Sequence, residues 1–351
     1  MKILVAIDSL KGCLSSEAAN HAAREGLRRR FPEAEIVCIP VSDGGEGFLE
    51  AMEAAVGGEL IEIMVRNPRM HLVRARYLLR ERTAYVEMAQ ASGLCLLKPE
   101  ERNPLTASSY GTGQLIADAA RRGANEIYVG LGGSATNDCG RGMLQALSDE
   151  LGEDGVARLR HETVFSIATD VDNPLCGPQG AARVFAPQKM SPHDMASPTE
   201  MVDELERRAC AFAAANARQY GHDCSRLPGA GAAGGAGYAL MQFFGAKRLS
   251  GAELMFEKAC FDTHLQEADL VVTGEGRADR QTLMGKLPVA VLRHARDFQV
   301  PVWLVAGQVT DCQELEEAGF ARVLQITPVG MSLDEAVCPD VATRNLMNVF
   351  C

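Results

Sequence analysis

Short apolar runs rich in Val and Ile alternate along the chain with longer amphipathic stretches, the pattern that βαβ units produce. The first amphipathic stretch follows Ser15, a residue that caps helices well, and it ends before Pro32. A second long helix is predicted over 198–219, where Glu and Arg recur at helical spacing. Strands are predicted over 2–7, 35–41, 84–88, 126–131, 164–169, 268–273, 300–306 and 322–326. The pattern therefore predicts an α/β fold with parallel sheets.

The two ends of the chain read as plain βαβ sequence, whereas the middle is less regular. A length of 351 residues suggests about two domains. Residues 66–82 are polar and rich in arginine, which we interpret as a crossing between domains. Because termini often lie close together, we expect one sheet built from both ends. The prediction is a Rossmann-like parallel-sheet domain over 1–74 plus 266–351, with an inserted α/β domain over 75–265.

Composition narrows the class of protein. The apolar share of 47% and the charged share of 23% are typical of soluble globular proteins. A net charge of −11 argues against nucleic acid or acidic membranes as partners, and no segment approaches the roughly 20 apolar residues of a membrane span. Eleven cysteines without a CxxC pair indicate reduced, mostly buried thiols and a cytoplasmic protein. The oligomeric state stays open, a homo-oligomer included.

Acidic residues and glycines follow five of the predicted strands. In open parallel sheets, ligands bind at the carboxyl ends of the strands. Asp and Gly after a single strand are commonly turn formers, but five such ends together favour a polar cleft. The five segments are 8–12, 43–47, 132–138, 170–173 and 274–280.

These segments suggest phosphoryl transfer, which needs backbone N–H groups around phosphate, carboxylates for Mg²⁺ and cations for the developing charge. Asp170 and Asp172 are the metal candidates, and Lys11 and Arg277 are cation candidates. Ser134 or Asn137 would equally well cap a helix. The phosphate-binding candidates are Gly44, Gly45, Gly132, Gly133, Gly274, Glu275, Gly276 and Lys286.

The context of two familiar nucleotide motifs argues against them. Residues 229–234 match GxGxxG, but they follow the segment 224–228, which is no strand, so a tightly packed, glycine-lined helix is the better interpretation. Gly285-Lys286 is not a P-loop, because Leu287 stands where Ser or Thr is required.

Ten short stretches, in the same order, resemble the bacterial glycerate kinases of the glycerate 2-kinase type. The resemblance implies two α/β domains with the active site in the cleft between them. It also implies ATP- and Mg²⁺-dependent phosphorylation of D-glycerate to 2-phosphoglycerate. The stretches are 8–15, 43–47, 87–94, 102–104, 110–113, 132–138, 172–175, 187–189, 228–235 and 273–282.

We expect the glycerate carboxylate to be held by Lys11, Arg102 or Arg277, because charge-assisted hydrogen bonds are strong. Asp43 or Asp279 would accept the proton of the attacking hydroxyl. The ATP phosphates would lie against 132–137 or 274–276. The remaining substrate-binding candidates are Asp8, Asn103, Ser134, Thr136 and Asn137.

Three alternatives stay open. The chain could phosphorylate a related hydroxy acid such as tartronate or a sugar acid. It could be an oxidoreductase that uses the glycine run at 229–234. It could also be an inactive ligand-binding homologue, because Cys13, Phe48 and Met190 replace residues that are usual in the family.

Overall fold

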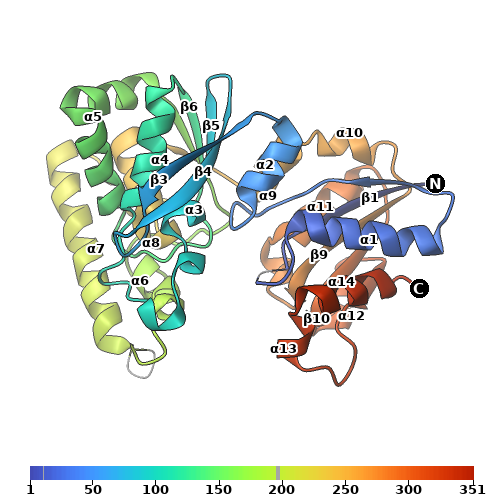
Figure 1. Ribbon diagram of the computed structural model, residues 1–351. Helices are drawn as coiled ribbons and strands as arrows, with labels where there is room; N and C mark the ends of the chain where they lie inside the picture. Colours follow the sequence, from blue (N-terminus) through green and yellow to red (C-terminus); the bar gives the residue numbers. More distant parts are fainter. Residues whose placement is uncertain (11, 195–197) are drawn as a thin grey trace. The chain divides into compact units, whose positions relative to one another are not determined.

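The computed structural model describes residues 1–10, 12–194 and 198–351 and divides the chain into two compact units (Figure 1). Unit 1 comprises residues 1–57 and 251–351, and unit 2 comprises residues 58–250. Lys11, a predicted catalytic cation, lies outside the described residues.

Unit 1 is built around a five-stranded sheet of order β11-β10-β9-β1-β2 in which every neighbouring pair is parallel. The chain leaves β1 toward β2 on one side and returns to β9 on the other. Its elements are β1 (Lys2–Ile7), α1 (Ser16–Arg30), β2 (Glu35–Cys38), α2 (Phe48–Val56), α9 (Gly251–Lys258), α10 (Phe261–Leu265), β9 (Leu270–Ala278), a 3₁₀ turn (Thr282–Met284), α11 (Leu287–Asp297), β10 (Val302–Val309), α12 (Cys312–Glu317), β11 (Arg322–Gln325), α13 (Leu333–Ala336) and α14 (Pro339–Asn348).

Both faces of this sheet are buried, which explains why its strands read as continuous apolar runs. Ile3 and Val5 belong to the apolar cluster shared with α1 and α14, whereas Leu4 belongs to the cluster shared with α9, α10 and α11. Strand alternation thus sends successive side chains into two separate cores. Gly26 lets α1 approach α14, because a Cβ there would lie 2.3 Å from the carbonyl oxygen of Met347.

Unit 2 contains a six-stranded sheet of order β3-β4-β5-β6-β7-β8. β4 is antiparallel to both β3 and β5, and the strands from β5 to β8 are parallel. Its elements are β3 (Glu59–Arg66), β4 (Leu72–Arg80), β5 (Thr83–Glu87), α3 (Ala89–Ser92), 3₁₀ turns (Leu94–Leu96, Pro99–Glu101, Pro187–Lys189), α4 (Tyr110–Arg121), β6 (Glu126–Gly130), α5 (Arg141–Glu162), β7 (Val164–Ala168), α6 (Ala181–Phe185), α7 (Thr199–Tyr220), α8 (Ala232–Phe244) and β8 (Lys247–Leu249).

The predicted α/β class and the sheet built from both chain ends are confirmed. All eight predicted strands are present, and the first helix begins after Ser15, whose hydroxyl accepts a hydrogen bond from the Ala18 N–H. The interpretation of residues 66–82 as a crossing between domains is wrong. That stretch contains β4, which pairs with a neighbour on each side. The boundaries of the units, 57/58 and 250/251, accordingly fall earlier than the expected 74/75 and 265/266.

Two further expectations need correction. β9 extends to Ala278 because its second half pairs with β10 from Ala306 to Val309, so residues 274–277 lie in a strand rather than in a loop. All eleven cysteines are free, as expected, but only Cys139 is fully buried. Among the described helices, none is both long and apolar enough to cross a bilayer.

Candidate active site

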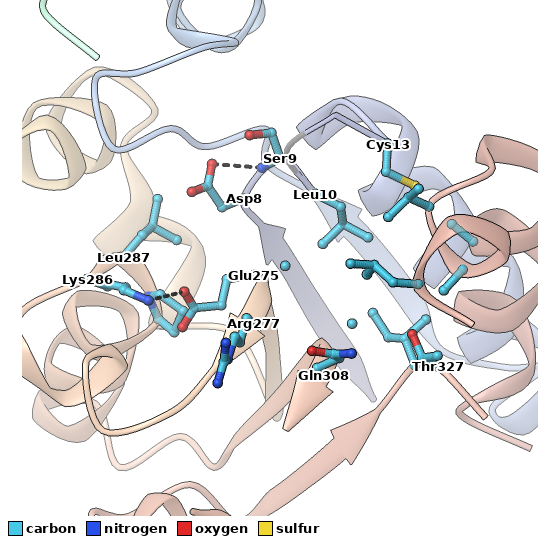
Figure 2. Close-up of a pocket in the computed structure, with 18 of the residues that line it drawn as sticks. Asp8, Ser9, Leu10, Cys13, Glu275, Arg277, Lys286, Leu287, Gln308 and Thr327 are labelled. Carbon is cyan, nitrogen blue, oxygen red and sulfur yellow. Dashed lines mark hydrogen bonds and ion pairs between the residues drawn. The ribbon is translucent and has the colours of Figure 1, made fainter. Parts of the chain in front are cut away.

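A cavity of about 540 Å³ opens at the carboxyl ends of β1, β9, β10 and β11 in unit 1 (Figure 2). Because the chain passes from β1 to opposite sides of the sheet, the β1/β9 pair is the topological switch point, where open α/β sheets bind ligands. The volume of the cavity is within the usual range for small-molecule sites, about 300–1,000 Å³. The cavity is lined at one end by polar groups and at the other by apolar side chains.

The first polar wall follows β1. Asp8 is buried, and one of its carboxylate oxygens accepts a hydrogen bond of 2.7 Å from the N–H of Ser9. The Ser9 hydroxyl also lines the cavity, is buried and has no hydrogen-bond partner among the described residues. Because a buried unpaired hydroxyl is costly, Ser9 indicates that a polar ligand group completes this wall.

Asp43 forms the second polar wall, and its position depends on local turn chemistry. Its carboxylate accepts a hydrogen bond from the Gly45 N–H at 2.9 Å, and the Gly44 N–H donates to the Ser42 hydroxyl. Gly251, the first residue of α9, contacts the Asp43 backbone so closely that a Cβ would lie 2.1 Å from the Asp43 carbonyl oxygen. The predicted phosphate-binding N–H groups of Gly44 and Gly45 are therefore used within this turn.

The third polar wall is a network of charged groups at the end of β9. Glu275 is buried, accepts a hydrogen bond of 2.6 Å from the Thr282 hydroxyl and forms an ion pair of 3.1 Å with Lys286. Arg277 forms an ion pair of 3.4 Å with Asp279, and its side chain is 63% exposed. Burial raises the pKa of Glu275, against the opposing effects of Thr282 and Lys286. The network offers two cations, Lys286 and Arg277, to the cavity (Figure 2).

The two glycines of this strand have different surroundings. Gly274 is packed inside the sheet, because a Cβ there would lie 2.3 Å from the carbonyl oxygen of Val305. Gly276 lines the cavity and has no atom within 4 Å of the position of a Cβ. Of the two predicted phosphate-binding glycines, Gly276 alone faces the cavity with open space around it.

The other end of the cavity is apolar. Leu10 contributes from the segment after β1, and Ile326 follows β11. Leu333 contributes from α13, Val337 from the residue after it and Ala342 from α14. This end has the character of a surface for a flat, weakly polar ring.

A second group of predicted residues lies in unit 2, after β6. Lys189 is buried, and its ammonium group donates to the Ser134 hydroxyl at 2.9 Å and to the Thr136 carbonyl oxygen at 2.8 Å. The two hydrogen bonds use two of the three N–H donors of the ammonium group. Lys189 forms no ion pair with any residue that the structure describes. Burial lowers the pKa of Lys189 to about 7, and the charge of Asp138 opposes this only in part.

Asp138, rather than Ser134 or Asn137, organises the start of α5. Its carboxylate accepts hydrogen bonds from the N–H groups of Ser109, Gly140 and Gly142 and from the Ser109 hydroxyl. The helix-cap explanation for Ser134 and Asn137 is therefore wrong. Asn137 is 4% exposed, and neither its amide nitrogen nor its amide oxygen has a partner.

The neighbouring candidates in unit 2 have mixed surroundings. Gly133 has a φ of 71°, and its carbonyl oxygen accepts from the Leu94 N–H, so Gly132 and Gly133 form a turn that docks on the 3₁₀ turn at Leu94. Asn103 closes a turn onto the Leu105 N–H. Arg102 has a buried Nε without a hydrogen-bond partner.

The two aspartates predicted to bind metal lie in the segment after β7. The Asp172 side chain is 77% exposed and forms an ion pair of 2.7 Å with Arg248. Asp170 is partly buried. The glycine run after residue 228 is a packed turn: Gly234 has a φ of 64°, and a Cβ there would lie 2.0 Å from the Thr136 carbonyl oxygen. This packing supports the structural interpretation of the run over a dinucleotide site.

The three departures from the family pattern fall in different places. Phe48 and Met190 are both fully buried, and Met190 packs in a small cluster with residues of α6 and α7. Cys13 lines the cavity of unit 1. Two of the three changes are therefore core residues.

Sequence reasoning missed three groups that the structure places at these sites. Ser9 and Gln308 line the cavity, and Lys189 lies beside Ser134. Ser9 lies directly after Asp8 in segment 8–12, one of the five segments predicted to form the polar cleft, so its position could have been used to predict it. Lys189 lies in one of the ten stretches that carry the resemblance, 187–189, but was given no role, and Gln308 had no signal.

The fold and the cavity define an α/β protein that binds a small polar ligand at the carboxyl edge of a parallel sheet. A family model for the glycerate kinase family matches residues 3–160 and 148–350. The glycerate kinase of Bacillus subtilis (strain 168) is 39% identical over 361 residues, which covers 96% of this chain and 93% of the relative. The glycerate 2-kinase of Escherichia coli (strain K12) is 40% identical over 362 residues, with the same two coverages of 96% and 93%.

A solved structure agrees with these sequence matches. The crystal structure of a protein described as glycerate kinase 2 from Salmonella typhimurium LT2 has a TM-score of 0.79 and 37% identity, and the match covers 100% of this chain and 96% of that one. The chain therefore belongs to the glycerate kinase family. The resemblance seen in the sequence and the expected enzyme class are confirmed.

Proposed function

We propose that this chain is an ATP-dependent kinase that phosphorylates D-glycerate at its 2-hydroxyl. The observation that carries the proposal is the cavity at the β1/β9 switch point, where carboxylates, two cations and an open glycine adjoin an apolar end. Membership of the glycerate kinase family supplies the substrate class. The free cysteines fit work in a reducing cytoplasm.

ATP fits the cavity with its adenine at the apolar end and its phosphates at the polar end. Lys286 and Arg277 are the cations for the phosphates, and Gly276 allows close approach of its backbone. Both cations are paired with carboxylates, Glu275 and Asp279. A bound triphosphate would have to compete with these carboxylates for the two cations. The pairing therefore selects for a strongly charged anion over a weakly charged one.

The donor set also fits Mg²⁺, which commonly binds one or two carboxylates together with phosphate oxygens and water. Asp8 is the carboxylate of the cavity that would hold it, together with phosphate oxygens and water. Mg²⁺ bound there would neutralise charge on the phosphates. Asp170 and Asp172 stay an untested alternative.

The polar cluster of unit 2 suits the hydroxy acid. Lys189 and the amide nitrogen of Asn137 are donors for a carboxylate, and the Asn137 amide oxygen is an acceptor for a hydroxyl. A hydroxy acid offers both groups in one small molecule. Its binding would supply the hydrogen-bond partners that the buried Asn137 side chain lacks among the described residues, and a carboxylate in direct contact with Lys189.

In the proposed reaction, the 2-hydroxyl oxygen of glycerate attacks the γ-phosphorus of ATP. The bond between this phosphorus and the oxygen that remains on ADP breaks. Asp43, which lines the cavity, accepts the hydroxyl proton, and Asp279 is the second candidate for this role.

The first test is ADP release by the purified chain with ATP, Mg²⁺ and D-glycerate, followed by ³¹P NMR of the product. We expect glycerate-dependent turnover and the 2-phosphate. Faster turnover with tartronate or a sugar acid in the same assay would identify a related kinase instead. No turnover from a folded chain that binds ATP would favour an inactive ligand-binding homologue.

A variant tests the placement of ATP. Lys286→Met should raise the KM for ATP and leave the KM for glycerate nearly unchanged, because the lysine faces the cavity of unit 1. Lys247→Met, at an exposed position in β8 of unit 2, is the matched control. An unchanged KM for ATP in Lys286→Met would contradict this placement.

A further inference from the structure

Three potential metal ligands converge in unit 2. The sulfur atoms of Cys176 and Cys210 and a carboxylate oxygen of Glu206 all lie within 4.8 Å of one another. Among the described residues, no other group of three His, Cys, Asp or Glu side chains is this close. The group is half-buried at Cys176 and Glu206 and exposed at Cys210.

Two of the ligands come from one turn of α7. Glu206 and Cys210 are four residues apart, so their side chains lie on the same helix face. The Cys210 sulfur is 3.6 Å from Oε1 of Glu206. This is the spacing with which a helix presents two ligands to one metal, as in the HExxH motif. Cys176 comes from the segment after β7 and supplies the third ligand.

Glu206 is oriented as a metal-binding carboxylate would be. Its Oε1 accepts a hydrogen bond of 2.6 Å from the backbone N–H of Gly177, which fixes the carboxylate against the segment that carries Cys176. Its Oε2 is buried and has no hydrogen-bond partner among the residues that the structure describes. An oriented carboxylate with one orphaned buried oxygen is costly without a cation, and hydrogen bonds of this kind typically orient metal ligands.

We propose that Cys176, Glu206 and Cys210 form a binding site for a thiophilic divalent cation, with Zn²⁺ as the occupant. Zn²⁺ binds Cys sulfur and Glu oxygen in tetrahedral sites, whereas Mg²⁺ and Ca²⁺ take oxygen ligands. Water would take the fourth position. The site does not depend on the proposed kinase reaction, and its ligands are distinct from the residues proposed for ATP or glycerate.

The test uses the full chain, reduced and stripped of metal with a chelator. Zn²⁺ affinity is measured by competition with a chromophoric chelator, and Co²⁺ is added to detect thiolate-to-cobalt charge-transfer absorption. We expect one tight Zn²⁺ per chain and a thiolate–cobalt band. Cys210→Ser and Glu206→Gln should each weaken Zn²⁺ binding at least about 10- to 100-fold, the cost typical of losing even an outer-shell partner.

Cys312→Ser is the matched control, because it removes an exposed thiol from α12 in unit 1. It should leave the affinity and the cobalt band unchanged. Equal loss in all three variants, or no loss in any, would show adventitious binding by scattered thiols and overturn the proposal. A disulfide between Cys176 and Cys210 in the freshly isolated chain, together with no Zn²⁺ binding after reduction, would overturn it as well. Circular dichroism verifies that each variant is folded.

Discussion

Lys189 is a buried cation without a carboxylate partner among the described residues, and this makes it the sharpest test of the glycerate site. Its pKa of about 7 results from burial, and Asp138 is the one charged group that acts on it appreciably. If the ammonium form binds the carboxylate, binding above pH 7 requires uptake of a proton. The KM for glycerate should then rise as the pH increases above 7, approaching about tenfold per pH unit.

Lys189→Met provides the comparison. Its KM for glycerate should be high at every pH and should lack the rise, while its KM for ATP stays near that of the original chain. Steady-state kinetics between about pH 6 and pH 9 measure both. A parallel rise in the two proteins would show that another group causes the pH dependence and that Lys189 only supports the loop after β6.

A second prediction at the residue scale separates the two candidate bases. Asp43 lines the cavity, whereas Asp279 is held by Arg277 and by the N–H of Gln281. Asp43→Asn should therefore lower kcat about 10²- to 10⁴-fold, the usual contribution of a general base. Asp279→Asn should lower it less. Calorimetric titration with ATP verifies that both variants keep their nucleotide site, and the reverse order of kcat values would assign the base to Asp279.

At the scale of elements, the segment that contains β4 can be tested for whether it behaves as a paired strand or as a linker. Arg74 and Arg76 of β4 pair with β3, and Arg80 at the end of the strand pairs with β5. Proteases cut segments that open locally, and paired strands open rarely. Limited trypsin digestion of the native chain should spare Arg74 and Arg76, with the fragments identified by mass spectrometry. Rapid cleavage there, at a rate near that of the denatured chain, would restore the linker interpretation.

The success of the sequence predictions depended on how local the determining forces are. β1 and α1 were predicted closely because an apolar run and a Ser15 cap are local signals. β4 was missed because its arginines mask a period of two, in which Ala75 and Tyr77 face the core. The end of β9 was misplaced because pairing with β10, not local sequence, extends it.

The candidate site was predictable to a similar degree. Asp8 and Asp43 lie in the segments after β1 and β2, Glu275 lies in the second half of β9, and Lys286 stands before α11. The cavity contains all four. The stretch 187–189 carries part of the resemblance, but the burial of Lys189 could not be predicted, because it depends on side chains distant in the sequence. Gly44 and Gly45 were expected to bind phosphate, but their N–H groups donate instead to the side chains of Ser42 and Asp43.

At the scale of the whole molecule, unit 2 is inserted into the sequence of unit 1. β9 lies between β1 and β10, so unit 1 needs both chain ends for a continuous sheet. Unit 2 is one continuous segment with its own sheet and its own apolar cluster around α4, α5 and α8. Residues 58–250 should therefore fold when expressed alone, with cooperative urea unfolding followed by circular dichroism.

The isolated segment also tests where ATP binds. A ligand stabilises the folded protein that binds it by about 2.7 kcal/mol at 100 times its Kd. ATP should thus raise the Tm of the full chain but not that of residues 58–250, because every residue that lines the cavity belongs to unit 1. An equal rise in Tm for the isolated segment would move the nucleotide to unit 2. The loop after β6, with Gly132 and Gly133, would then be the phosphate site, and Lys189 would face a phosphate rather than a carboxylate.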